Sequence, residues 1–192
     1  MVKIKGEGLG REIIIEENPL SKWLFTNTTS AWIWLILRLY LGYTWLMAGI
    51  GKVTSDAWTG ENAGAAVKGF MGGAIALAED GDVAGWYAWF LENLVIPNAV
   101  VFSYMVAWGE LLVGLGLIVG LLTGIAAFFG ALMNMSFLLA GTVSSNPVMF
   151  IIAILLIMAW KVAGWYGLDR WALPFLGTPW TLRKKDPSSN DS

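Results

Sequence analysis

Two charged residues lie inside apolar stretches of this sequence, where their side chains could pass protons or bind a charged group. Arg38 occurs early in the stretch 34–52, WLILRLYLGYTWLMAGIGK, which ends at Lys52. Glu110 is the one charge in the stretch 98–120. Because an ionisable side chain in hydrocarbon is costly unless it is paired, each is a candidate for a functional role. We therefore predict that Arg38 and Glu110 form a buried pair.

Helical spacing supports this pairing. On the first stretch, steps of four and three residues place five side chains on one face: Arg38, Gly42, Trp45, Gly49 and Lys52. The matching face of the second stretch has small residues around one acid: Ser103, Ala107, Glu110 and Gly114. Measured from the cytoplasmic ends of their helices, Arg38 lies at a depth of roughly 10 Å and Glu110 at roughly 15 Å, which a long arginine can bridge.

The predicted pair has two interpretations. In the catalytic one, Arg38 and Glu110 take part in chemistry and Glu110 passes protons. In the structural one, the pair only fixes the register of two helices. Asn134, in the third apolar stretch, reaches a similar depth and could hydrogen-bond to either side chain.

The composition indicates a membrane protein and excludes several kinds of site. Of the 192 residues 57% are hydrophobic and 14% are charged, with a mean hydropathy of +0.63, which is more apolar matter than a soluble domain of this size buries. A net charge of -2 and the absence of a basic stripe give no case for nucleic-acid binding. The chain has no cysteine and no histidine, so we expect no haem, iron–sulfur cluster or other metal.

Four stretches are long enough to cross about 30 Å of hydrocarbon as helices. They are residues 31–51, 98–120, 125–143 and 147–165. Short connections between the last three favour antiparallel neighbours. We predict an all-α integral membrane protein, a four-transmembrane-helix bundle with one or two interfacial helices in the long loop between the first two spans. A fifth span at residues 63–78 stays open as an alternative.

The basic residues predict the orientation in the membrane. They gather in the first 30 residues and from Lys161 onward, so both termini should be cytoplasmic. The segment 53–97 is acidic and should face outward. We expect a cytoplasmic tail at 1–30, a membrane domain at 31–180 and a basic, polar cytoplasmic tail at 181–192, in a prokaryotic plasma membrane.

Three motifs carry a resemblance to a known family: GELLVGLGL at 109–117, LAGTVSSNP at 139–147 and GLDRW at 167–171. Over roughly residues 35–180 the chain resembles the DoxX/DoxD family of small four-helix membrane proteins. The resemblance implies a membrane oxidoreductase component, similar to the large subunit of an archaeal thiosulfate:quinone oxidoreductase. It supplies no catalytic residues, so the site below is inferred from the sequence itself.

A thiosulfate and quinone chemistry needs an anion site, a quinone pocket and a proton route. We place the quinone against Trp45, Tyr43 and Trp108, with Glu110 as the proton carrier. The anion would lie at Lys52, where the helices that begin near Asn98 and Asn146 point their positive ends. Both asparagines are more simply explained as N-caps.

We expect the lipid bilayer and a second oxidoreductase subunit as partners, with a homo-oligomer as a further option. The alternative function is a non-catalytic membrane scaffold subunit or a carrier of small molecules.

Overall fold

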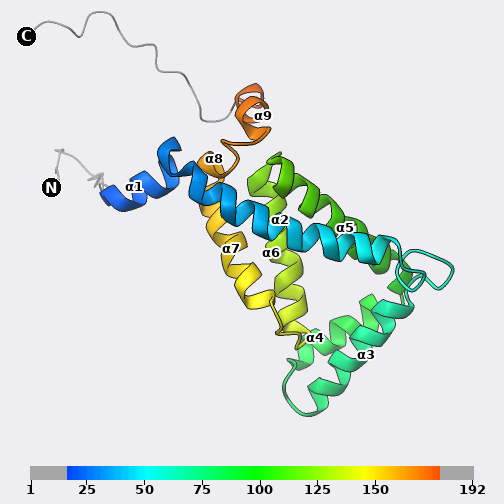
Figure 1. Cartoon of the computed structure of the whole chain (residues 1–192). Coiled ribbons are helices and arrows are strands. Elements are labelled where there is room, and N and C mark those ends of the chain that lie inside the picture. Colours follow the sequence, from blue (N-terminus) through cyan, green and yellow to red (C-terminus); the bar gives the residue numbers. More distant parts are fainter. Residues whose placement is uncertain (1–16, 178–192) are drawn as a thin grey trace, which may run out of the picture.

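The computed structural model describes residues 17–177, and all regular elements in that range are helices (Figure 1). The α-helices are α1 (Pro19–Thr26), α2 (Ala31–Val53), α3 (Ala65–Glu79), α4 (Gly85–Phe90), α5 (Ala99–Val119), α6 (Thr123–Leu139), α7 (Asn146–Met158), α8 (Trp160–Ala163) and α9 (Asp169–Phe175). A 3₁₀ turn at Thr28–Ser30 precedes α2, and a π-helical turn at Leu91–Val95 follows α4. The predicted tail 181–192 and residues 1–16 of the predicted tail 1–30 lie outside the described residues.

The four long helices form two antiparallel pairs. Figure 1 shows α2 and α5 side by side, with α6 and α7 as a second pair that meets the first near α8. The two pairs diverge from this end, and α3 crosses the wide end of the wedge that they enclose. The segment predicted to hold one or two surface helices therefore holds α3, α4 and the π-helical turn.

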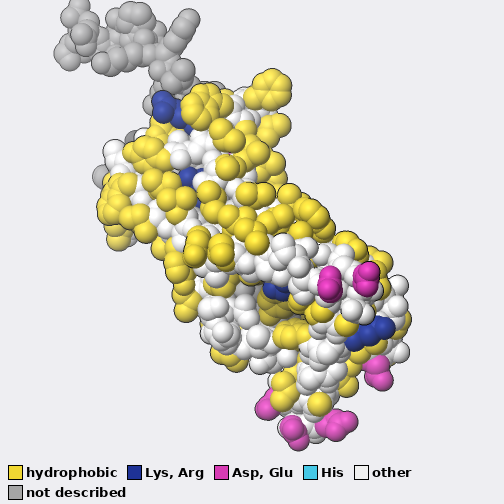
Figure 2. All heavy atoms as spheres, turned by 45° about the vertical axis from the view of Figure 1, so that its right-hand side comes forward, with side chains coloured by type: hydrophobic (Ala, Val, Ile, Leu, Met, Phe, Trp, Pro, Cys, Tyr) yellow, Lys and Arg dark blue, Asp and Glu magenta, His cyan; other side chains and the backbone are white. Residues whose placement is uncertain are grey.

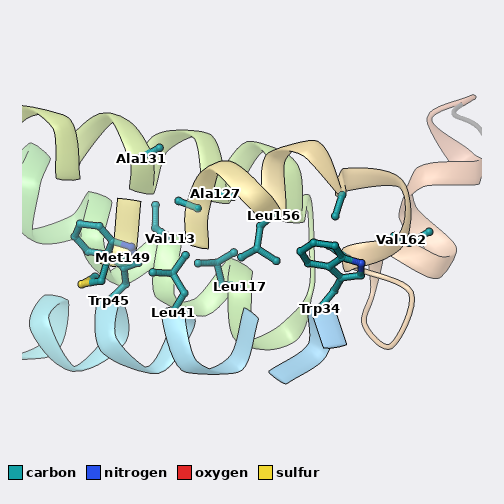
Figure 3. Close-up of a cluster of buried hydrophobic side chains, with 13 residues drawn as sticks. Trp34, Leu41, Trp45, Val113, Leu117, Ala127, Ala131, Met149, Leu156 and Val162 are labelled. Atoms are coloured by element: carbon teal, nitrogen blue, oxygen red, sulfur yellow. The ribbon is translucent and has the colours of Figure 1, made fainter. Parts of the chain in front are cut away.

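A continuous core joins the two pairs at the narrow end of the wedge. Leu41, Leu117 and Leu156, from three different helices, are fully buried in it. Figure 3 shows the core as a row of side chains with Trp34 near one end and Trp45 beside Met149 at the other. A second buried cluster lies beneath α3 and includes Val67, Tyr87 and Leu91. Burial of these side chains in hydrocarbon-like packing holds α3 and α4 against α5 and α6.

The turns between the helices follow from local chemistry. Gly120 ends α5 in the left-handed conformation, with a φ of 66°, which a glycine adopts without strain. Asn98 is the N-cap residue of α5, as predicted, whereas Asn146 is the first residue of α7 and follows the N-cap residue Ser145. Neither side chain caps a helix: the Asn98 amide donates to the Leu94 carbonyl at 2.8 Å and the Asn146 amide donates to the Thr142 carbonyl at 2.9 Å. The Asn98 amide thus bonds back to the π-helical turn before α5, and the Asn146 amide bonds back to the loop before α7.

Two of the described helices are long and apolar enough to cross a membrane. They are α2, counted with its preceding turn as Thr28–Val53, and α5. The predicted third and fourth spans correspond to shorter apolar helices, α6 with 17 residues and α7 with 13. Helix α3 covers most of the segment left open as a fifth span, but its 15 residues fall short of the roughly 20 needed to cross hydrocarbon.

Candidate functional site

A cavity of about 370 Å³ lies in the wedge between the two helix pairs. Figure 2 shows a hollow on the side of the molecule with a basic side chain inside it. Its walls come from all four long helices, from α3 and from the loop before α7. The lining residues are Thr44, Trp45, Ala48, Lys52, Trp58, Phe70, Glu110, Phe137, Thr142, Ser144, Ser145, Asn146 and Met149. A volume near 370 Å³ falls at the lower end of the roughly 300–1,000 Å³ typical of ligand sites.

The charged group of this cavity is an ion pair between Lys52 and Glu110. The Lys52 ammonium donates a hydrogen bond to a Glu110 carboxylate oxygen at 2.6 Å. The Glu110 side chain is 1% exposed and that of Lys52 is 22% exposed, so the acid is buried and the lysine reaches the cavity surface. Lys52 also lies over the Trp58 ring, 5.1 Å from its centroid. The ammonium is thus held on two sides.

Close contact between α2 and α5 brings these two residues together. The hydrogen of Gly49 faces the backbone of Leu111, and the hydrogen of Gly114 faces the backbone of Leu46. A Cβ atom at either glycine would lie 2.6 Å from a Cα atom of the other helix, so only glycine allows this approach. The two faces predicted from helical spacing do meet here, and small residues on both lie at the contact.

The predicted pairing of Arg38 with Glu110 is wrong. Gly49 faces Leu111, which places Glu110 near the Lys52 end of α2, whereas Arg38 lies against Gly120 beyond the other end of α5. The 14 residues from Arg38 to Lys52 span about 21 Å of helix. The prediction assumed that both helices end at the same level, but the start of α2 extends past the end of α5.

Arg38 belongs instead to a second buried polar cluster at the narrow end. Its guanidinium donates to the Tyr166 carbonyl at 3.1 Å and interacts electrostatically with Asp169. The Asp169 carboxylate accepts backbone hydrogen bonds from Leu122 at 2.5 Å and Thr123 at 2.9 Å, which are the N-cap residue and the first residue of α6. Arg38 and Asp169 are each 1% exposed. This cluster fastens the turn between α5 and α6 to the loop before α9.

The remaining predicted site residues divide into two groups. Trp45 and Asn146 line the cavity together with Lys52 and Glu110. Tyr43 and Trp108 do not: they are 62% and 46% exposed on the outer surfaces of α2 and α5.

Asn134 is fully buried on α6 but is not a lining residue of the cavity. Its amide oxygen and nitrogen have no hydrogen-bond partner among the described residues. The buried indole nitrogen of Trp45 also has no hydrogen-bond partner among the described residues. It packs against Gly130, one turn before Asn134 on α6. Two buried polar groups thus lie behind the cavity without an internal partner.

Sequence reasoning missed several walls of the cavity. Trp58 and Phe70 come from the long segment between α2 and α5, and Phe137 packs edge-on against Phe70 with ring centroids 6.1 Å apart. No periodic signal marks Trp58, which lies in a loop. Thr142, Ser144 and Ser145 lie in the motif LAGTVSSNP, but of this motif the predicted site contains only Asn146.

Comparison with known proteins gives one match. The family model described as DoxX matches residues 33–143, a range that covers α2 to α6 and contains both Lys52 and Glu110. No curated protein and no solved structure matches the chain. Because the match covers more than half of the sequence, the chain belongs to the DoxX family of membrane proteins.

Proposed function

We propose that this DoxX protein crosses the bilayer with four helices and acts as the quinone-reactive component of a membrane oxidoreductase. The 17 residues of α6 are about 25 Å long, and α7 continues into α8, so both helices are close to the thickness of the hydrocarbon core. Both pack along the two longer spans, which supports a membrane location for all four.

The observation that carries the proposal is the Lys52–Glu110 pair in the wall of a cavity that four aromatic side chains also line. The Trp58 ring lies under the Lys52 ammonium, and Trp45, Phe70 and Phe137 supply further flat apolar surfaces in the walls of the same cavity. The Lys52 ammonium has a hydrogen-bond donor to offer to a carbonyl oxygen, and Glu110 can hold or release a proton next to it. A ring that bears carbonyl groups fits these features.

The charge of the cavity favours a neutral ligand over an anion. Lys52 is already neutralised by Glu110, so a dianion such as thiosulfate would meet a carboxylate as well as an ammonium. The predicted anion site also required the start of α5, but Asn98 does not line the cavity. We therefore assign the cavity to quinone and the oxidation of thiosulfate to a partner subunit.

The electrons and protons balance in this assignment. Two thiosulfate ions give one tetrathionate and two electrons, and a bound quinone takes up these two electrons with two protons to form quinol. The residues of this chain would hold the ring and supply or relay the protons. In the alternative function, a scaffold or carrier, the cavity would hold no quinone.

The test is whether the purified protein binds quinone at this pair. Organic extraction of the protein should yield quinone, and added 2,3-dimethoxy-5-methyl-1,4-benzoquinone should quench tryptophan fluorescence, because Trp45 and Trp58 line the cavity. The double variant Lys52→Met/Glu110→Gln removes the pair without leaving one charge alone, and it should weaken quenching at least tenfold.

A matched control changes the same two residue types on the surface of α3. Lys68 and Glu79 are exposed and do not line the cavity, so the variant Lys68→Met/Glu79→Gln should bind quinone with the same affinity as the unmodified protein. Absence of both extracted quinone and quenching in the unmodified protein would contradict the proposal and favour the scaffold or carrier.

A further inference from the structure

The cavity has a polar end and an apolar end. Its polar walls include Lys52 and Glu110, three residues of the loop before α7 and the first residue of α7, which are Thr142, Ser144, Ser145 and Asn146. At the opposite end Trp45 and Met149 are almost fully buried, and Figure 3 shows them together at the edge of the apolar core. A ligand that fills the cavity therefore meets charges at one end and hydrocarbon at the other.

The apolar end lies beside the seam between α2 and α7. These two helices belong to different pairs, which diverge toward α3, and the hollow in Figure 2 is on the side of the molecule. On α2 the seam is bordered by Thr44 and Ala48, both small and partly exposed. The Thr44 hydroxyl donates to the Tyr40 carbonyl at 3.0 Å, so its hydrogen is already bonded within its own helix.

We infer that the cavity takes an amphiphilic ligand from within the bilayer, with its polar ring at Lys52 and Glu110 and its apolar chain leaving between α2 and α7 past Ala48. This inference rests on the proposed function and names the class of quinone that the site uses: one with a long hydrocarbon tail. A lipid-soluble ligand of this shape reaches the pair through the seam without crossing the acidic outer segment.

A second apolar groove offers a different place for such a tail. It lies between α5 and α6, has a volume of about 660 Å³ and includes Gly109, Leu112 and Gly116. This groove has no lining residue in common with the cavity. A tail attached to a ring at Lys52 would reach it by a longer route, through a smaller cavity of about 170 Å³ under α3. That cavity shares Trp58, Phe70 and Phe137 with the site and Met105, Leu132 and Met133 with the groove. The seam between α2 and α7 is therefore the assigned exit.

The first experiment compares two quinones with the same ring. One is 2,3-dimethoxy-5-methyl-1,4-benzoquinone, and the other carries an additional ten-carbon chain. Ala48→Phe narrows the seam and should weaken quenching by the long-chain quinone at least tenfold more than it weakens quenching by the ring alone. The matched control is Leu112→Phe, because Leu112 is 63% exposed in the other groove, and it should change neither affinity.

A second measurement keeps the test independent of how well Ala48→Phe folds. The chain has no cysteine, so a single introduced thiol is the one target for an alkylating group. A fully substituted quinone with a haloacetamide at the end of its ten-carbon chain should label Thr44→Cys or Ala48→Cys in membranes. Leu112→Cys should stay unlabelled, and free long-chain quinone should protect the labelled variants.

The outcomes separate the inference from the proposed function. Equal weakening of both quinones by Ala48→Phe, no weakening of either, or labelling at Leu112→Cys instead would overturn the exit through the seam while quinone binding stands. Absence of quenching by either quinone in the unmodified protein would overturn both.

Discussion

Among single residues, the partner of Glu110 decides how the site is stabilised. A carboxylate that is 1% exposed is stable as a charge only because Lys52 lies 2.6 Å away. The two partners do not depend on each other equally, because the lysine keeps 22% of its side-chain surface exposed. Lys52 can find other polar neighbours or solvent, whereas Glu110 has no such option.

This asymmetry gives the first prediction. Lys52→Met leaves the Glu110 charge buried without its partner and should lower the free energy of unfolding by roughly 3–5 kcal/mol. Glu110→Gln leaves a lysine that can turn outward, so its cost should be only about 1–2 kcal/mol. The double variant should lose less than the sum of both changes, as measured by denaturation in detergent micelles.

A second double-mutant cycle tests whether Arg38 and Glu110 contribute independently to the free energy of unfolding, as the distance between them requires. Arg38→Met combined with Glu110→Gln should give losses that add within about 0.5 kcal/mol, because the two side chains lie in different clusters. Coupling well above that value would mean that the two residues do touch, and the assignment of Lys52 as the partner would then fail.

At the level of elements, the contact between α2 and α5 depends on two glycines. A methyl group at Gly49 would meet the backbone of Leu111, so Gly49→Ala should force the helices apart and cost about 1–3 kcal/mol. Gly51 lies on the same helix with nothing within 4 Å of an added Cβ. Gly51→Ala is the matched control and should be neutral or stabilise by about 0.5–1 kcal/mol, since alanine favours a helix. Thermal unfolding of both variants checks this prediction, and equal losses would contradict it.

The start of α6 depends in the same way on a residue from another element. Asp169→Ala would leave the backbone N–H groups of Leu122 and Thr123 unpaired and the Arg38 charge without its acidic neighbour. We expect a loss of roughly 3–5 kcal/mol, since a buried charge is stranded together with two donors. Asp82 is an exposed acid between α3 and α4, and Asp82→Ala should leave the unfolding midpoint almost unchanged. Similar midpoints for the two variants would show that Asp169 does not hold the turn.

The helices and their facing sides could be predicted from the sequence, but their register could not. A period of 3.6 residues identifies which side chains share a face, and it placed Lys52 and Glu110 on faces that do meet. The axial offset between two helices is set by where their backbones fit together, here at Gly49 and Gly114. That fit depends on both helices at once, so counting from the helix ends paired Glu110 with the wrong cation.

At the scale of the whole molecule, the wedge shape was the feature that the sequence did not indicate. Hydropathy predicts apolar stretches of similar length, yet α2 has 23 residues and α7 only 13. Because α3 packs across the wide end, the two pairs need not close on each other, and a cavity remains between them. Trp58 and Phe70 reach that cavity through tertiary packing, which no local pattern records.

The distribution of charge over the whole molecule gives the last prediction. Acidic side chains gather at the end formed by the segment between α2 and α5, as Figure 2 shows, while α1 and α8 lie at the opposite end. The excess of basic residues near both termini predicts that the end with α1 and α8 faces the cytoplasm.

Single cysteines at Glu17 and Lys161, both exposed at that end, should react with a membrane-impermeant maleimide only after the cells are opened. A cysteine at Asp80, in the turn after α3, should react in intact cells. Since the chain has no native cysteine, the unmodified protein is the blank. Reaction of Glu17→Cys and Lys161→Cys on opposite faces would exclude an even number of spans between them, and reaction of all three from the same face would exclude crossing by α2.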